Sequence, residues 1–385
     1  MTPPRGFPDT EFRARVARAQ GLMANVGLGA LLLTTEPEVR YYTGFLTRFW
    51  ESPTRPWFVV LPAAGDPIAV IPSIGAHLMG QTWIDDIRTW QAPDYDDDGI
   101  GLLAETLREV TPSDAKIGVA DQMESPLRMP LADFERLRHA IGARQITGDA
   151  AITRRLRLLK SSAEVAKITQ AAQIADRAFD RVAEIARAGV PLSQVFRDFQ
   201  RLCLEEGADW VPYLAGAAEN GGYGDVISPA TDAPLAPGDV LMLDTGLVWD
   251  GYFCDFDRNF SLGPPSQSVA QAHARLIEAT QAAFHAAIPG AKICDLFHAM
   301  NDVVNPGGTG SDAGRLGHGL GMQLTEWPSI IAADTTLLEP GMVLTLEPGV
   351  TLPGGKIMVH EENIVVEHGG ARFLSAPQAQ EIRVI

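Results

Sequence analysis

Three aspartates are placed so that one predicted β-hairpin brings them together. The dipeptide Asp250-Gly251 stands between two apolar, aromatic runs, a pattern typical of a two-residue hairpin turn. With that turn, Asp244 lies opposite Asp257, and Asp255 lies two residues along on the same face. Opposed side chains have Cβ atoms roughly 5 Å apart, so these carboxylates repel one another unless a cation lies between them. Taken alone, the pattern also fits solvated aspartates near a turn.

A second predicted hairpin also carries acidic residues within apolar strands. Its turn, Pro353-Gly354-Gly355, is three residues long and places Glu347 opposite Glu361, and a bulge would shift this pairing by one residue. An unpaired carboxylate is costly to bury. We therefore expect the two hairpins to converge on shared cations.

A histidine flanked by glycines lies between the two hairpins in the sequence. His318 stands in the segment 316–321, whose glycines let the backbone come close and leave the imidazole unobstructed. Four carboxylates and one imidazole suit a pair of Mn, Fe, Co or Zn ions. Two such ions, bridged by carboxylates and a water, generate a hydroxide nucleophile near neutral pH and polarise a carbonyl group. The predicted chemistry is therefore metal-assisted hydrolysis.

Alternating helix and strand patterns predict an α/β domain in the N-terminal part of the chain. Apolar residues recur at helical spacing over 11–25. Further strands and helices follow in alternation, at 30–33, 57–61, 67–71, 102–110 and 117–120. Because the pattern changes near residue 150, we place the two domains at residues 1–155 and 156–385.

The second domain is predicted to be of the α+β type. Ser161 and Glu164 have the spacing of a capping box at the start of a long amphipathic helix. The predicted elements are helices at 163–188 and 192–206, strands within 239–262, a helix at 268–287, a glycine-rich segment at 307–321, and strands at 342–348 and 357–366. Strands grouped at the two ends with helices between them indicate an α+β arrangement.

The composition narrows the classes of partner. The chain has 48 acidic and 31 basic residues, a formal charge of -17, which repels nucleic acids and anionic lipid surfaces. Its three cysteines are an odd number, which does not indicate a secreted disulfide framework, and its apolar runs are too short to span a bilayer. We expect a cytoplasmic protein that binds neither nucleic acid nor membranes.

The motifs around these residues resemble those of the pita-bread metallopeptidases, the family of methionine aminopeptidase, prolidase, aminopeptidase P and creatinase. The similar stretches in the C-terminal half are 156–164, 238–246, 251–258, 317–321, 341–349 and 361–366. In the N-terminal half, 38–45 looks like the corresponding part of creatinase and prolidase, so the resemblance covers nearly the whole chain. It implies an α/β creatinase-like N-terminal domain and an α+β pita-bread catalytic domain.

The resemblance also implies roles for the acidic residues and the histidine. Asp244 would bind one divalent ion, Asp255 and Glu361 would bridge both ions, and His318 and Glu347 would hold the second. Mn, Co, Zn and Fe are the usual metals of the family. The catalytic residues would be His318 and Glu347, with Glu347 assisting proton transfer from the bridging water.

The chain departs from the family pattern at positions near this site. The segment 215–234 contains no histidine, and Thr325 stands where a second family histidine is usual. Both losses remove donors that would hold a peptide carbonyl or its oxyanion, unless Tyr223, Asp225 or Thr325 replaces them.

Two further departures introduce ionisable groups. Asp257 stands where threonine is usual, so a fifth acidic group is expected to touch the metals or to orient a ligand. His360 stands where an aliphatic residue is usual, and we expect it to face outward from its strand.

Two functions remain open on the sequence. The first is a dinuclear metal-dependent hydrolase that resembles Xaa-Pro dipeptidases and aminopeptidases and acts on a dipeptide or another small amide. The second is a lyase or a non-peptide C–N hydrolase that acts on a small zwitterionic solute, such as a dimethylsulfoniopropionate- or ectoine-type compound. A metal-free binding protein is a third, weaker hypothesis.

Assembly as a homodimer is also expected. The stretch 45–57 is aromatic and cationic within an acidic chain, and such residues are enriched in interface anchors. In the relatives, loops of this region approach the site of the neighbouring subunit. We therefore expect Arg48 or Trp50 of one subunit to complete the substrate site of the other, with Arg48 or Arg55 binding a substrate carboxylate.

Overall fold

The computed structural model describes residues 2–52, 56–123, 125–307 and 314–385, and Arg55 lies outside this part. The chain forms two compact units, Pro4–Arg157 and Leu158–Ile385, the second of which also includes Thr2 and Pro3. The first unit is of the α/β type and the second is of the α+β type, as the sequence predicts.

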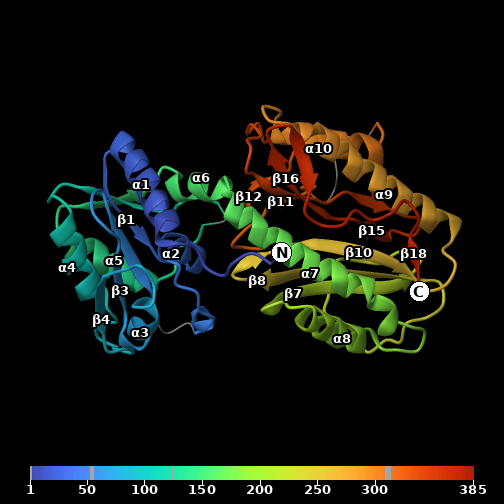
Figure 1. Ribbon diagram of the computed structural model, residues 1–385, viewed down its shortest axis with the longest axis horizontal. Helices are drawn as coiled ribbons and strands as arrows, with labels where there is room; N and C mark the ends of the chain where they lie inside the picture. Colours follow the sequence, from blue (N-terminus) through green and yellow to red (C-terminus); the bar gives the residue numbers. More distant parts are fainter. Residues whose placement is uncertain (1, 53–55, 124, 308–313) are drawn as a thin grey trace. The chain divides into compact units, whose positions relative to one another are not determined.

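The N-terminal unit is built on a six-stranded sheet with the order β4-β3-β2-β1-β5-β6 (Figure 1). The strands are β1 (Leu28–Leu33), β2 (Phe58–Pro62), β3 (Ile68–Pro72), β4 (Asp86–Trp90), β5 (Lys116–Val119) and β6 (Gln145–Gly148). The helices are α1 (Asp9–Val26), α2 (Glu36–Thr43), α3 (Ala76–Met79), α4 (Ile100–Val110), α5 (Leu131–Ala140) and α6 (Ile152–Leu158). The helix and strand patterns of the sequence are therefore confirmed in this unit.

Apolar strand residues pack against helices α4 and α5 to form the core of this unit. Leu32, Val60 and Val70 project from three neighbouring strands and contact Leu103 and Leu107 of α4 within one buried cluster. Full burial of a leucine or valine side chain contributes about 1.5–3 kcal/mol to the free energy of folding. The unit thus has a hydrophobic core of its own.

The C-terminal unit contains two main sheets and two pairs of helices (Figure 1). Its helices are α7 (Ser162–Asp180), α8 (Leu192–Glu205), α9 (Gln267–Ala286) and α10 (Ile293–Val304). The first sheet consists of β7 (Trp210–Asn220), β8 (Asp239–Trp249), β9 (Tyr252–Phe253), β10 (Phe256–Ser261) and β18 (Arg383–Val384). The second consists of β11 (His318–Gly319), β12 (Glu326–Ser329), β13 (Val343–Leu346), β16 (Glu362–Glu367) and β17 (Gly370–Phe373), and β14 (Gly349–Thr351) pairs separately with β15 (Ile357–Val359).

Each helix pair packs against a different set of strands. Helices α7 and α8 contact β8 and β7, whereas α9 contacts β13, β14, β15 and β17. Buried residues of α9, α10, β13 and β16 share one apolar cluster. The strands thus lie between helices, and the acidic strand residues are held in the interior of the unit.

Both predicted hairpins have the predicted register. Asp250 and Gly251 have φ values of 49° and 78°, and Asp244 is the Cα partner of Asp257. In the second hairpin, Gly349 pairs with Val359, and Leu346 pairs with Glu362. No bulge separates these pairs, so Glu347 and Glu361 face each other between them.

The first C-terminal helix is shorter than predicted. It begins with the predicted capping box, in which Glu164 N donates to Ser161 Oγ and Ser161 N donates to the Glu164 carboxylate. It ends at Asp180, and a 3₁₀ turn (Val182–Glu184) follows. The apolar spacing over 163–188 could not reveal this change, because Val182 and Ala186 remain buried beyond the helix end.

Strand β7 is absent from the sequence prediction. Its sequence is broken by Pro212 and is rich in alanine and glycine, so it lacks the alternation of a typical strand. A Cβ at Gly216 would lie 2.3 Å from the carbonyl oxygen of Met242 on β8, so the close approach of the two strands requires glycine there. The pairing with β8, rather than the local sequence, defines this strand.

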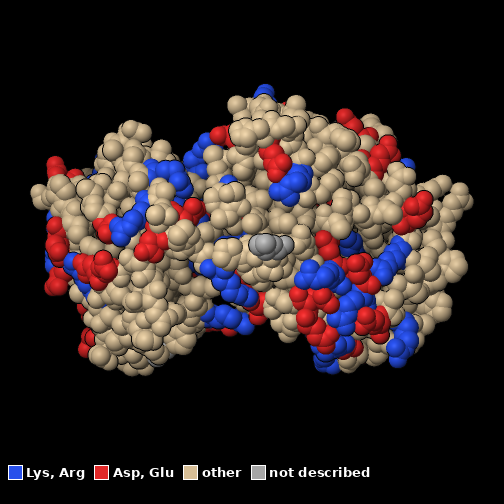
Figure 2. All heavy atoms as spheres, in the orientation of Figure 1, with Lys and Arg blue, Asp and Glu red and all other residues tan. Residues whose placement is uncertain are grey.

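Opposite charges are intermixed on the surface around α8 (Figure 2). Arg181 pairs with Glu184, Glu205 and Glu206 at 2.9–3.0 Å. These exposed pairs each contribute little to stability. Among the described residues, no helix is long and apolar enough to cross a membrane.

Replacing Gly317 by alanine should destabilise the unit and displace His318. Gly317 has a φ of 134°, and a Cβ there would lie 2.3 Å from the carbonyl oxygen of Thr345. Backbone strain alone costs about 1–3 kcal/mol. We therefore expect the free energy of unfolding, measured with urea, to fall by at least about 2 kcal/mol. Gly369→Ala is the control, because a Cβ there meets nothing within 4 Å. Equal stability of the two variants would contradict this account of Gly317.

Candidate metal centre

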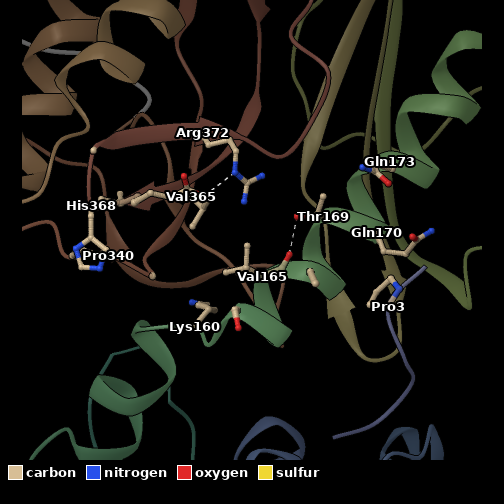
Figure 3. A pocket seen from close by; sticks show the side chains of 16 residues that line it. Pro3, Lys160, Val165, Thr169, Gln170, Gln173, Pro340, Val365, His368 and Arg372 are labelled. Carbon is tan, nitrogen blue, oxygen red and sulfur yellow. Dashed lines mark hydrogen bonds and ion pairs between the residues drawn. The ribbon is translucent and has the colours of Figure 1, made fainter. Parts of the chain in front are cut away.

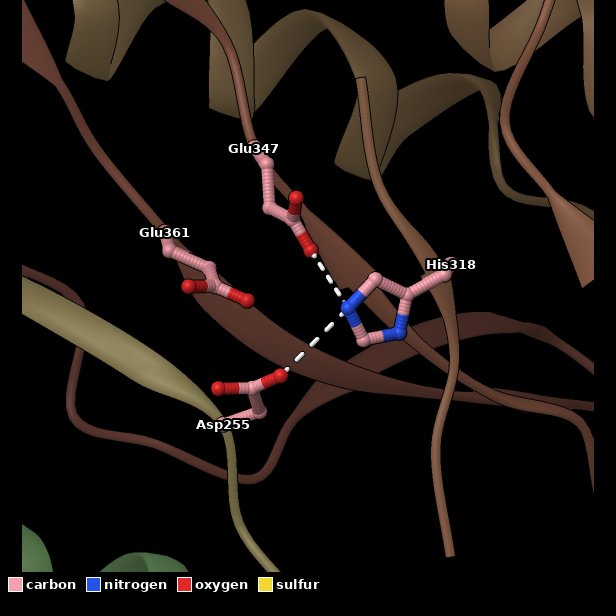
Figure 4. Close-up of side chains that lie close together, drawn as sticks. All are labelled: Asp255, His318, Glu347 and Glu361. Atoms are coloured by element: carbon pink, nitrogen blue, oxygen red, sulfur yellow. Dashed lines mark ion pairs between the residues drawn. The ribbon is translucent and has the colours of Figure 1, made fainter. Parts of the chain in front are cut away.

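Four of the five proposed metal ligands form one cluster (Figure 4). Asp255, His318, Glu347 and Glu361 each offer a ligand atom, and these atoms lie within 4.8 Å of one another. His318 Nε2 is 3.0 Å from Glu347 Oε1 and 3.3 Å from Asp255 Oδ2. Figure 4 shows the side chains pointing toward a common centre from separate segments of the backbone.

Hydrogen bonds fix the ligand side chains from behind. His318 Nδ1 lies 2.7 Å from the carbonyl oxygen of Gly319, and this contact turns Nε2 toward the carboxylates. The hydroxyl of Thr345 donates to Glu347 Oε1 and accepts from His318 N. Asp255 N donates to Asn363 Oδ1 at 3.0 Å. The site is therefore positioned by strands from both sheets of the unit.

Two acidic groups of the cluster resist ionisation, whereas a third favours it. Burial, followed by repulsion from Asp255, raises the pKa of Glu361 well above its ordinary value. Burial also raises the pKa of Asp255 to about 6, although His318 opposes this shift. Burial alone would lower the pKa of His318, but Glu347 and Asp255 raise it to about 10. Burial alone would raise the pKa of Glu347, but His318 lowers it to about 2. The cluster thus favours bound positive charge.

Asp244, the fifth proposed ligand, lies beside the four-residue cluster. Burial raises the pKa of its carboxyl well above the ordinary value, and Asp255 and Asp257 add repulsion. Its Oδ2 accepts a hydrogen bond from the Tyr213 hydroxyl at 3.0 Å. Tyr213 was not identified from the sequence, because β7, the strand that carries it, was not predicted.

The donor set fits divalent metal ions. Asp244 Oδ1 and Glu361 Oε1 are buried and lack a hydrogen-bond partner among the described residues. Buried carboxylate oxygens without partners are costly, and a bound cation removes that cost. Carboxylates together with one imidazole are ligands of Mn, Fe, Co and Zn.

The expectation that His360 faces outward is wrong. Only 1% of its surface is exposed, and the ring lies between two carboxylates. Its Nε2 is 3.2 Å from Glu362 Oε1, and its Nδ1 is 3.7 Å from Asp257 Oδ1. His360 lies between β15 and β16, where the chain passes through the interior of the unit, so strand alternation did not apply there.

Asp257 and the neighbouring Arg258 project in different directions. Asp257 is buried opposite Asp244, as predicted, and approaches His360. Arg258 points to the other face, as its alternation indicates, and its Nη2 lies 3.0 Å from Glu362 Oε2. Despite burial, Arg258 and His360 lower the pKa of Glu362 to about 2. A buried network of alternating charge therefore lies next to the metal-ligand cluster.

The three suggested replacement donors have different surroundings. Thr325 lies at the cluster, with Oγ1 3.5 Å from His318 Nε2. Tyr223 is fully buried, and its hydroxyl already donates to Asn259 Oδ1 and accepts from Val359 N. Asp225 is exposed and accepts hydrogen bonds from Ser228 in its own loop. Of the three, only Thr325 lies against a ligand.

Arg315 is a further residue of the site that the sequence analysis missed. Its Nη2 donates to Thr325 Oγ1 at 3.5 Å, and its charge opposes the rise in the pKa of Asp255. The only signal in the sequence is a basic residue three positions before His318.

Arg48 and Trp50 belong to the N-terminal unit and have partners within it. Arg48 Nη2 pairs with Glu51 at 2.8 Å on the surface. The Trp50 ring is buried beside Trp57, and the Arg128 guanidinium lies 5.2 Å from its centre. Their role across a dimer stays a prediction.

A pocket of about 780 Å³ on the C-terminal unit is a different feature (Figure 3). Lys160, Val165, Thr169, Val365 and Arg372 are among its lining residues, which include none of the four clustered ligands. At its floor, Lys160 Nζ forms a buried pair with Glu326 at 3.1 Å. The cavity is therefore separate from the candidate metal centre.

An α/β unit followed by an α+β unit that carries this cluster defines a two-domain metal-dependent hydrolase. The model of metallopeptidase family M24 matches residues 166–368, and the creatinase/prolidase N-terminal domain matches residues 15–159. The chain belongs to metallopeptidase family M24, a family of hydrolases. The resemblance to creatinase and prolidase and the pita-bread fold are thereby confirmed.

The similarity extends over the whole chain. A probable dipeptidase, PepE, from Mycobacterium bovis is 30% identical and aligns over 95% of both chains. The crystal structure of dipeptidase PepE from Mycobacterium ulcerans has a TM-score of 0.83, with 28% identity and 99% coverage of both chains. Prolidase from Thermococcus sibiricus has a TM-score of 0.85 at 22% identity, covering 97% of this chain and 99% of its own, and shares the fold.

Replacing Asp255 by asparagine should lower the metal content of the protein. The neutral amide is a poorer ligand, and Asp255 is one of the two carboxylates that approach His318 within the cluster. We expect loss of at least one ion per chain after Mn loading and dialysis, measured by elemental analysis. Glu278→Gln, at an exposed position on α9, is the control. Full metal content in Asp255→Asn would contradict the assignment.

Proposed function

We propose that this protein is a dinuclear metal-dependent hydrolase that cleaves dipeptides or similarly small amides. The observation that carries the proposal is the convergence of three carboxylates and His318 within 4.8 Å, with Asp244 beside them. The dipeptidase names of the PepE relatives support the substrate class.

The proposed ligands divide between two ions. Asp244 would hold one, His318 and Glu347 would hold the other, and Asp255 and Glu361 would contribute to holding both. When bound, ions such as Mn, Fe, Co or Zn lower the pKa of a water molecule and polarise the scissile carbonyl group. The four carboxylates of the proposed site balance the charge of two divalent ions better than the charge of one.

The side chains of the site move the protons and hold one another in place. The Glu347 carboxylate accepts a proton from the attacking water and passes it to the leaving amine as the C–N bond breaks. The Thr345 hydroxyl holds Oε1 of Glu347, which leaves its second oxygen for this transfer. Tyr213 orients Asp244 through its hydroxyl.

We also propose a cytoplasmic homodimer. The three cysteines are free and buried, which agrees with a reducing compartment. In the dimer, Arg48 or Trp50 of one subunit contributes to substrate binding in the other.

Removal of the metal should abolish hydrolysis and destabilise the chain. Ions that bind only the folded state raise its stability, and here they also relieve repulsion between buried carboxylates. After EDTA treatment and dialysis, we expect no turnover of alanyl-leucine and a lower melting temperature in calorimetry. Added Mn should restore both, whereas added Ca should not restore turnover. Full activity of the metal-depleted protein would contradict the proposal.

Xaa-Pro dipeptides should be cleaved slowly. Each oxyanion donor is typically worth about 10²–10³ in rate, and the resemblance implies that two histidine donors are missing. With Mn bound, we expect kcat for alanyl-proline at least about tenfold below that of ordinary prolidases. A turnover comparable to that of ordinary prolidases would show that these histidines are dispensable.

A further inference from the structure

Arg315 is a cation at the edge of the candidate metal centre. Its side chain is half-buried, and no carboxylate of the described residues lies within ion-pairing distance of it. Its one hydrogen bond with a described residue is the 3.5 Å contact from Nη2 to Thr325 Oγ1. Thr325 Oγ1 is in turn 3.5 Å from His318 Nε2. The guanidinium therefore lies one side chain away from a ligand atom of the cluster.

The backbone beside Arg315 is fixed. Leu316 N donates to the Ile330 carbonyl at 2.9 Å, and the Leu316 carbonyl accepts from Glu347 N at 3.0 Å. The Leu316 side chain is fully buried in the core cluster below α9 and α10. The φ of 134° at Gly317 then interrupts the regular strand alternation, so that Arg315 and His318 can both reach Thr325. Arg315 is thus held at the site by its neighbours.

The guanidinium of Arg315 has donors suited to a carboxylate. A guanidinium has five N–H donors and matches a carboxylate with two parallel hydrogen bonds. Since only Nη2 is engaged with a described residue, most of this donor capacity is available to a ligand.

We propose that Arg315 binds the terminal carboxylate of the substrate and thereby makes the site specific for dipeptides and N-acylated amino acids. This inference rests on the proposed function. In a dipeptide, the carboxylate carbon is only two bonds from the scissile nitrogen, so it must lie close to the metal-binding carboxylates, which repel it. A fixed cation beside His318 offsets that repulsion. A longer peptide or an amide has no negative charge at this position.

The test compares a carboxylate with its neutral amide in wild type and in Arg315→Gln. Turnover of alanyl-leucine and alanyl-leucinamide by the Mn-loaded protein gives kcat and KM for both substrates. Calorimetric titration with analogues of both compounds, in which a methylene group replaces the scissile carbonyl, gives binding without turnover. We expect wild type to favour the carboxylate form about tenfold to a hundredfold, and Arg315→Gln to lose this preference through a higher KM and Kd.

Two further variants show whether the effect belongs to the guanidinium. Arg315→Lys keeps the charge but loses the paired hydrogen bonds, so it should retain part of the preference. Arg372→Gln removes an exposed arginine that pairs with Glu367 and should behave as wild type. Metal content is measured for each variant, so that loss of metal is not mistaken for loss of binding.

The possible results separate this inference from the proposed function. Dipeptide turnover in wild type with an unchanged carboxylate preference in Arg315→Gln would overturn the inference alone. Absence of turnover on every dipeptide would overturn the proposed function, and the calorimetric comparison would still decide whether Arg315 binds the carboxylate. Equal binding of the two analogues to wild type would also overturn the inference.

Discussion

Mutual repulsion among buried carboxylates is the constraint on which the catalytic unit depends. At 4.8 Å, two unit charges repel by about 3.5 kcal/mol if the effective dielectric constant is about 20. Several such pairs would approach the whole stability of a typical domain, about 5–15 kcal/mol. His318 offsets part of this repulsion in the protein itself, and the proposed divalent ions would offset much more. Binding of these ions would then be linked to folding of the unit.

The turns are responsible for bringing the acidic residues together. The Asp250-Gly251 turn sets the register that pairs Asp244 with Asp257, and the Pro353-Gly354-Gly355 turn sets the register around Glu347 and Glu361. A slip of one residue in either hairpin would turn its carboxylates to the opposite face. Residues several positions from the cluster therefore control its geometry without contacting it.

Prediction from the sequence succeeded where local chemistry determines structure. Turn residues determined both hairpin registers, and the capping box at Ser161 marked the start of α7. Strand β7 depends instead on pairing with β8, so Tyr213 and its hydrogen bond to Asp244 could not be anticipated. Arg315 was missed for a similar reason, because its proximity to Thr325 depends on the return of the chain along β12.

His360, which was expected to face outward, and Asp257 are both unusual at their positions, and each accounts for the presence of the other. Considered separately, Asp257 adds an acid to a site that already has several, and His360 places an ionisable ring in an apolar strand. In the structure the two face each other at 3.7 Å, and on its other side His360 meets Glu362, which Arg258 also holds. Asp257 and Glu362 raise the pKa of His360 against its burial, so the ring favours its charged form. A positive charge between these two acids offsets the extra negative charge that Asp257 brings next to Asp244.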